Sequence, residues 1–318
     1  MVVHFWIRAS SFPLREGFKM QRKAGKIFFI VFLLFLSGSF FHLQHVDSQD
    51  QKNFLWRVQS QTATVYLLGS IHFMKRELYP LPQRIEGAFD HSGVLAIGAN
   101  INDLDHMDAQ PWMGRAYYPG QEGIEDHLSG ETYERAKKES ERLGLSLRHL
   151  RKRKPWFLAF TLTGRELARM GFDPRDRLDK YFLSKATGRK KIIEIESLEE
   201  QVHPMSSLSD EDQELFLLST IEDLPALKEE VDRLLRIWST GDLKGMESLS
   251  FRDRKEDRRS SPAFEKIVYD RNQRMISKVE DFLRTGETYF VIVGAGHLLG
   301  GRGMIEMLKE KGYRVEQF

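Results

Sequence analysis

Cysteine is missing from all 318 residues of the chain. Its absence excludes disulfide bonds, thiolate metal ligands, a cysteine nucleophile and a lipoprotein attachment site. An excess of one charge is also missing, because 48 basic and 46 acidic side chains leave a formal net charge of +2. Nucleic-acid-binding domains usually carry a strong basic excess, so the composition predicts no nucleic-acid partner. Hydrophobic residues make up 41% of the chain, which is enough for a folded core.

An unbroken apolar run extends from Ile27 to Leu36 and follows a group of basic residues that begins at Lys19. A basic segment followed by a short apolar run is typical of an export signal. We therefore expect residues 1–41 to be a signal peptide or an N-terminal membrane anchor and residues 42–53 to be a linker. Basic residues that flank a membrane-inserting segment stay on the cytoplasmic side of the membrane. The body is thus predicted to be exported, either periplasmic or tethered to the outer face of the inner membrane.

The hydrophobic patterns that follow the linker predict an α/β domain. Short apolar or β-branched runs predict strands at 54–58, 64–68, 94–97, 191–195, 289–293 and 313–318. Helical spacing predicts helices at 81–89, 132–142, 156–170, 178–186, 210–218, 224–238, 262–283 and 304–311. The expected fold is a central mixed sheet formed by two related strand–helix halves. A helical insert at about 107–285 separates the halves within a domain that covers 54–318.

Two segments of the chain, TVYLLGSIH and TYFVIVGAGH, share one pattern: an apolar strand, a glycine, two residues and a histidine. Gly69 and Gly294 predict a tight exit from each strand, which places His72 and His297 at the carboxyl ends of strands. Ligands bind at this edge of open α/β sheets. Because imidazole can either bind a metal ion or accept a proton, the repeat predicts one functional site shared by both histidines.

A metal ion held by two histidines needs further ligands. Glu196, at the end of the strand in the middle of the chain, is our candidate for a carboxylate. The alternative is a helix-start role, in which this carboxylate interacts with backbone N–H groups. Asp103 and Asp105 are further candidates. Arg271 or Arg302 would stabilise a developing oxyanion, or would form ordinary ion pairs instead.

The second histidine lies in a glycine-rich segment, VGAGHLLGGRG. Its glycines do not follow the G-x-G-x-x-G spacing of a dinucleotide-binding loop, so no nucleotide cofactor is expected. We instead assign Gly69, Gly294 and Gly296, which flank the two histidines, to the walls of the cofactor site.

The order of several motifs resembles the TraB/GumN family, which also contains the Tiki-type proteases. The shared motifs are GSIH, KPW, the GFD and LDKYFL segments, IEIESLEEQ, DRN and GAGH, and the resemblance covers residues 54–318. It implies an α/β fold similar to that of the erythromycin-esterase and ChaN-like proteins. It further implies a divalent-metal site that uses both Gly-x-x-His histidines, and peptide-bond hydrolysis in the Tiki branch. Mn, Co or Zn is the expected metal.

The sequence departs from this family pattern after the first motif. Where the family pattern has Glu-x-Asp at the end of a strand, this chain has Gly98 and Asn100. A glycine can neither bind a metal ion nor move a proton. Three explanations stay open: Asp103 or Asp105 substitutes, Glu196 supplies the carboxylate, or the chain has lost turnover and kept a binding site.

The leading hypothesis is a metal-dependent hydrolase, namely a peptidase that acts on a peptide or protein substrate. His72 and His297 would bind the metal, which activates water for attack on a carbonyl. The second hypothesis is a catalytically weakened protein that binds a peptide or another ligand in the same cleft. The third is a metal-free esterase in which a histidine is the base and Ser70 the nucleophile.

Overall fold

The computed structural model describes residues 52–71, 73–98, 114–251 and 268–318. Several residues singled out in the sequence, His72, Asn100, Asp103 and Asp105, lie outside the described residues, as does the predicted export signal. Within the described ranges, no helix combines the length and apolar character needed to cross a membrane.

Six strands form one mixed sheet, which confirms the predicted fold class. The strands are β1 (Leu55–Gln59), β2 (Thr64–Ser70), β3 (Val94–Ile97), β4 (Lys191–Glu194), β5 (Thr288–Gly294) and β6 (Arg314–Gln317). Their order is β4-β3-β5-β2-β1-β6. The four strands from β4 to β2 are parallel to their neighbours, whereas β1 is antiparallel to both β2 and β6. The strands predicted at 54–58 and 64–68 pair as a hairpin, and the strand predicted at 313–318 is present at one edge of the sheet.

The two strands of the repeated motif are direct neighbours. β2 and β5 pair in parallel, with Gly69 opposite Val293 and Ser70 opposite Gly294. Neighbouring strands lie about 4.8 Å apart. The chain therefore leaves β2 and β5 at the same edge of the sheet and from adjacent positions.

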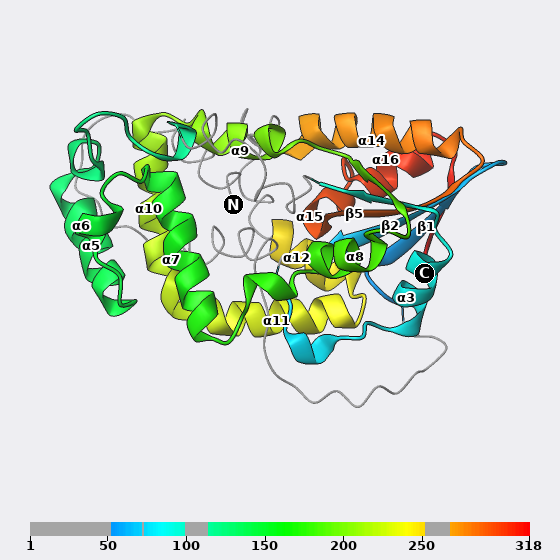
Figure 1. The fold of residues 1–318 in the computed structure, drawn as a ribbon, viewed down its shortest axis with the longest axis horizontal. Helices are drawn as coiled ribbons and strands as arrows, with labels where there is room; N and C mark the ends of the chain where they lie inside the picture. Colours follow the sequence, from blue (N-terminus) through cyan, green and yellow to red (C-terminus); the bar gives the residue numbers. More distant parts are fainter. Residues whose placement is uncertain (1–51, 72, 99–113, 252–267) are drawn as a thin grey trace.

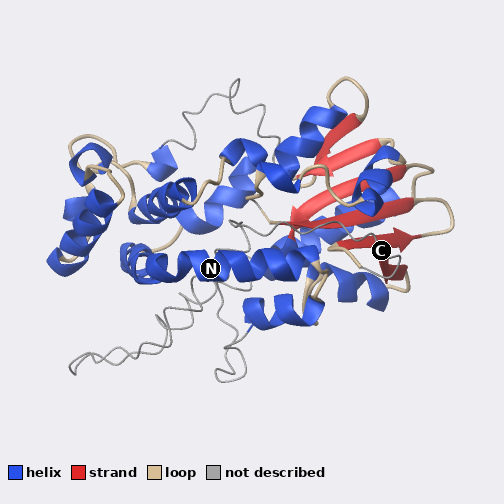
Figure 2. Ribbon diagram, turned by 90° about the horizontal axis from the view of Figure 1, so that it is seen from below, coloured by secondary structure: helices blue, strands red, loops and turns tan. Residues whose placement is uncertain are grey.

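Helices cover both faces of the sheet and extend beyond one end of it (Figure 1, Figure 2). The longer helices are α3 (Gln83–Asp90), α5 (Gly130–Arg142), α7 (Pro155–Arg169), α8 (Leu178–Ala186), α9 (Leu198–Ser206), α10 (Asp210–Asp223), α11 (Leu227–Ser239), α12 (Leu243–Phe251), α14 (Asp270–Leu283) and α16 (Met304–Glu310). Two shorter helices are α6 (Leu147–Leu150) and α15 (Ala295–Leu298). Most of the helices predicted from spacing are present, but α6, α9, α12 and α15 were not among those predicted from spacing.

Aromatic side chains of β5 show which helices cover which face. Phe290 lies with Phe89 of α3 and Phe182 of α8, with ring centroids 5.5 Å and 4.8 Å away. The next residue back, Tyr289, stacks on Phe282 of α14 at 4.4 Å. Successive side chains of a strand point to opposite faces. Helices α3 and α8 therefore cover one face of the sheet and α14 covers the other.

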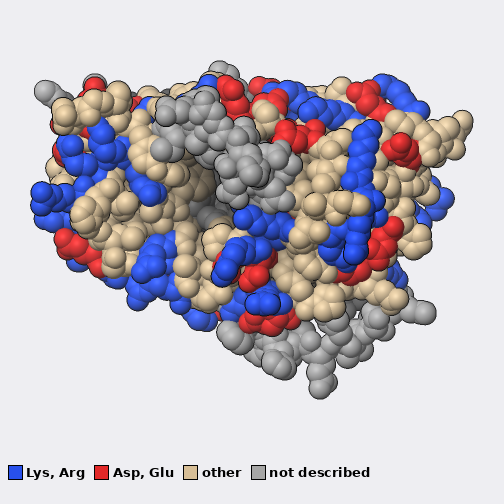
Figure 3. Space-filling model, viewed as in Figure 1, with Lys and Arg blue, Asp and Glu red and all other residues tan. Residues whose placement is uncertain are grey.

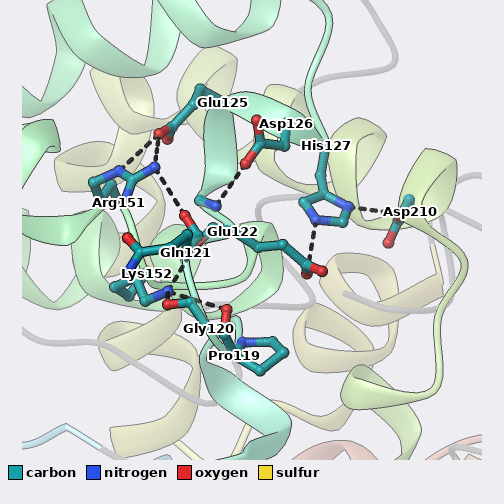
Figure 4. A network of polar contacts seen from close by, with 11 residues as sticks. Pro119, Gly120, Gln121, Glu122, Glu125, Asp126, His127, Arg151, Lys152 and Asp210 are labelled. Atoms are coloured by element: carbon teal, nitrogen blue, oxygen red, sulfur yellow. Dashed lines mark hydrogen bonds and ion pairs between the residues drawn. The ribbon is translucent and has the colours of Figure 1, made fainter.

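At the other end of the molecule, α5, α6, α7 and α10 form a helical layer away from the sheet (Figure 1). His127 joins two parts of this layer, because its ring stacks on Tyr118 at 4.0 Å and its Nδ1 lies 2.8 Å from Asp210 Oδ2 (Figure 4). Nearby, Lys152 Nζ donates to the backbone carbonyls of Gly120 and Glu122 at 2.7 Å and 2.8 Å. The contacts with Tyr118 and Asp210 give His127 a structural role.

Candidate functional site

His297 lies on α15, immediately after β5, at the carboxyl edge predicted from the sequence. Its side chain is only 3% exposed. In Figure 1, α15 lies at the end of the sheet that points to the middle of the molecule, toward α7 and α10. Figure 3 shows that this face is hollowed beside the helical end. The histidine therefore occupies a buried position near a concave part of the molecule.

One hydrogen-bonded chain fixes the orientation of this imidazole. Asn272 Nδ2 donates to the carbonyl oxygen of Arg302 at 2.9 Å, so Asn272 Oδ1 is the amide atom that faces the ring. The distance from His297 Nδ1 to Asn272 Oδ1 is 2.7 Å. Nδ1 therefore carries the hydrogen, and in the neutral ring the lone pair is on Nε2. Metal-binding histidines are typically oriented in this way by a partner on the other ring nitrogen.

The first motif is packed more tightly than the sequence indicated. Gly69 lies inside β2, where a Cβ atom would be 2.7 Å from Phe54 Cδ1 and 3.0 Å from Leu298 Cδ1. Its carbonyl oxygen accepts a hydrogen bond of 2.7 Å from Trp238 Nε1. The glycine is needed for this close approach, and the strand continues for one more residue to Ser70. The exit from the sheet thus comes after Gly69 rather than at it.

Glu196 is buried beside the start of α14 and forms a two-pronged ion pair with Arg271. The guanidinium Nε and the second nitrogen Nη2 lie 2.7 Å and 2.6 Å from the two carboxylate oxygens. The side chains are 5% and 10% exposed, respectively. Ser197, not Glu196, caps α9. The carboxylate of Glu196 is thus held by a cation, and the N-cap role at the start of α9 belongs to Ser197.

The ion pair and the histidine support are adjacent on one helix. Arg271 binds Glu196 after β4, and the next residue, Asn272, binds His297 after β5. The start of α14 thus connects the ends of two strands of the sheet. This connection lies across β3, which runs between β4 and β5.

The remaining predicted residues are placed as follows. The Arg302 guanidinium lies 3.8 Å from the ring centroid of Tyr269, and its carbonyl accepts from Asn272. Ser70, the nucleophile of the esterase hypothesis, is 2% exposed at the end of β2. Gly294 ends β5, and Gly296 lies on α15 beside His297.

The described part of the chain contains no group of three or more His, Asp or Glu side chains arranged to hold a metal ion. One histidine is nevertheless prepared for such a role, because the Asn272 bond presents His297 Nε2 as the lone-pair nitrogen. His72 lies outside the described residues. A single imidazole could hold a metal ion only together with further ligands.

A cavity of about 260 Å³ borders the segment that follows His297. Leu298, Leu299 and Gly300 form part of its wall, and Trp56 and Val315 line it from β1 and β6. The cavity therefore borders the residues that follow His297, and His297 is not one of the residues that line it.

Lys75, three positions after the first motif, was not singled out in the sequence. It is 3% exposed, and burial lowers the pKa of its ammonium group, an effect that the nearby carboxylates of Glu77 and Asp232 oppose only in part. Its Nζ lies 5.3 Å from the centroid of the Phe172 ring. Only a structure reveals this burial, because a lysine in a polar loop is normally solvated.

Replacing Lys75 with methionine is expected to stabilise the protein at pH 7. Burial disfavours the charged form, so the folded protein loses this proton below the pH at which the unfolded chain does. The resulting cost is present at neutral pH and disappears as pH rises toward the unfolded value of 10.5. We expect the melting temperature at pH 7 to rise by roughly 2–4 °C. The gain should shrink above pH 9. Lys137→Met, on the surface of α5, is the control and should leave the melting temperature unchanged both at pH 7 and above pH 9.

Comparison with known proteins gives three results. A model of the TraB/PrgY/gumN family matches residues 54–317. The chain is 24% identical to a "Metalloprotease TIKI homolog" of Amphimedon queenslandica and 26% identical to "Metalloprotease TIKI1" of Danio rerio, over 85% and 86% of this chain but only 62% and 64% of those proteins. It is 26% identical to "Uncharacterized protein YbaP" of Escherichia coli (strain K12), over 77% of this chain and 87% of that protein. No solved structure matches.

Proposed function

Because this chain belongs to the TraB/PrgY/gumN family, we propose that it is a metal-dependent hydrolase that cleaves peptide bonds. Relatives named metalloproteases support this proposal, although the chain spans only about three fifths of their length. The substrate class that we propose is a peptide or protein. The metal that we propose is Mn, Co or Zn, bound by His72 and His297.

The observation that carries the proposal is the support of His297. A buried imidazole whose Nδ1 is bonded to Asn272, and which directly follows the strand beside that of the first motif, is an arrangement suited to a metal ligand. A divalent ion bound there would supply Lewis-acid activation of water and of a carbonyl. Asn272 keeps the ring in one tautomer, and the Glu196–Arg271 pair keeps the start of α14 in place.

A second candidate function is supported by Gly98. This residue directly follows β3 at the same edge and offers no carboxylate. The adjacent carboxylate, Glu196, is neutralised by Arg271. Among the described residues at this edge, so little uncompensated negative charge favours a protein that binds a peptide or small ligand with weak turnover. We retain this binding protein as the alternative.

We also propose that the body acts outside the cytoplasm. The basic and apolar N-terminal segment supports export, with a periplasmic body or one tethered to the outer face of the inner membrane. In the tethered form the membrane would be a partner through that segment.

The function can be tested by comparing wild type, His297→Ala and Gly98→Glu. Bound Mn, Co and Zn would be measured in each purified chain, together with cleavage of internally quenched peptides of random sequence. If the protein is a peptidase, the wild-type chain should bind metal and cleave peptides, and the His297→Ala variant should do neither. Activity that arises only in Gly98→Glu would support the binding protein. Wild type without bound metal would contradict both the metal site and the proposed chemistry.

A further inference from the structure

Gly98 leaves space at the carboxyl end of β3, and a side chain from another element fills that space. A Cβ atom at position 98 would lie 2.5 Å from Gln201 Nε2 and 3.7 Å from Gln201 Cδ. Carbon and nitrogen atoms that are not bonded do not approach to 2.5 Å, so a side chain at position 98 would require the Gln201 side chain to move. The carboxamide of Gln201 therefore occupies the position that any side chain at residue 98 would take.

The backbone that presents Gln201 is held firmly. Ser197 and Glu200 form a reciprocal cap at the start of α9, with distances of 3.2 Å from Glu200 N to Ser197 Oγ and 2.7 Å from Ser197 N to Glu200 Oε2. Gln201 N donates to Ser197 O at 3.3 Å. The residue before the cap, Glu196, is tied to Arg271. Only the end of the Gln201 side chain is left to move.

The Gln201 carboxamide lies beside the carboxyl end of β3, the strand that Gly98 follows. β3 lies between β4, which leads to Glu196, and β5, which leads to His297. Gln201 thus brings a neutral group that can both donate and accept hydrogen bonds to the edge that holds His297. A peptide group also has one donor and one acceptor, so a carboxamide can pair with it without the cost of burying a charge.

We infer that Gly98 and Gln201 form one ligand-binding unit, in which the glycine makes room for the carboxamide and the carboxamide binds a main-chain peptide group of the ligand. This inference rests on the proposed function for the class of ligand, which is a peptide. It assigns the recognition of the peptide group to Gln201 and leaves metal binding to other residues. Gly98→Ala and Gln201→Ala should then have the same effect, since the new Cβ displaces the end of a flexible side chain.

A double-substitution cycle tests the inference. The dissociation constant of a dye-labelled decapeptide of random sequence would be measured by fluorescence polarisation on EDTA-treated full-length chain, so that no turnover occurs. Gln201→Ala and Gly98→Ala are each expected to raise the dissociation constant about 5–10-fold, the effect of one lost hydrogen bond. The double variant should be no weaker than either single variant. Gly87→Ala on α3, where a Cβ atom meets nothing within 4 Å, is the matched control.

A second measurement separates this inference from the proposed function. Co²⁺ binding, followed by visible absorption, should be the same in wild type and in both single variants. Wild type that binds Co²⁺ and peptide, with unchanged or additive peptide affinities in the variants, overturns the role of Gln201 alone. Wild type that binds neither Co²⁺ nor peptide overturns both. Reduced Co²⁺ affinity in Gln201→Ala would make the residue part of the metal site and would overturn its assignment to the peptide group.

Discussion

Replacing Asn272 with leucine is expected to weaken divalent-metal binding by about 10- to 100-fold, the usual loss when the partner of a ligating histidine is removed. Leucine has a similar size but cannot accept the Nδ1 hydrogen of His297, which Asn272 Oδ1 accepts at 2.7 Å. The ring would lose its fixed tautomer and orientation. The loss can be measured as the change in the Co²⁺ dissociation constant by calorimetry, and peptide cleavage should fall in parallel.

Asn272→Asp is the matched control, because aspartate keeps an acceptor toward Nδ1 while it loses the donor to the Arg302 carbonyl. We expect it to keep most of the wild-type metal affinity. Thermal unfolding of both variants would show whether the fold is retained. Wild-type Co²⁺ affinity in a folded Asn272→Leu variant would show that the imidazole does not act through this bond.

Much of the fold follows from local patterns in the sequence. The strands at 94–97 and 191–195 and the edge strand at the C-terminus were predicted from apolar runs and turn residues, and each is present within a few residues. Helical spacing likewise located α5, α7, α8, α10 and α11. α12 was missed because Gly245 and its serines give it a weak helical pattern. The helix predicted from Pro262 lies within the described residues only from position 268 onward, and α14 begins at Asp270.

The candidate site was less accessible to sequence reasoning. The repeated motif predicted a shared edge, and the parallel pairing of β2 with β5 supplies the geometry that brings the two motifs together. The functions of Asn272 and Gln201 could not be inferred, because each depends on a contact with a residue distant in the chain, His297 and Gly98. The DRN motif contained Asn272, but nothing in its spacing indicates a partner on α15, which follows β5. Only the arrangement of α14 and α9 over the sheet edge reveals these partners.

Replacing Arg271 with methionine is expected to lower the free energy of unfolding by about 3–5 kcal/mol. The guanidinium holds both carboxylate oxygens of Glu196, and both side chains are almost fully buried. Methionine fills much of the volume but leaves the carboxylate buried without its cation, and an uncompensated buried charge is strongly destabilising. Urea unfolding followed by circular dichroism would measure the loss.

Arg274→Met on the same helix is the matched control. Arg274 lies 3.6 Å from Glu200, and these side chains are 48% and 38% exposed. Exposed ion pairs contribute about 0–1 kcal/mol, so this substitution should cost little. A loss in Arg271→Met no larger than in Arg274→Met would show that Glu196 is not dependent on its partner.

The double variant Glu196→Leu with Arg271→Met separates stability from function. An apolar pair of similar volume can be as stable as a buried ion pair, so we expect most of the lost unfolding free energy to return. The directional bonds that fix the start of α14 against β4 do not return with it. Since Asn272 is the next residue on that helix, His297 should stay poorly oriented and Co²⁺ affinity should stay about 10-fold below wild type. Recovery of both the free energy of unfolding and the Co²⁺ affinity would mean that the ion pair stabilises the fold without positioning the histidine.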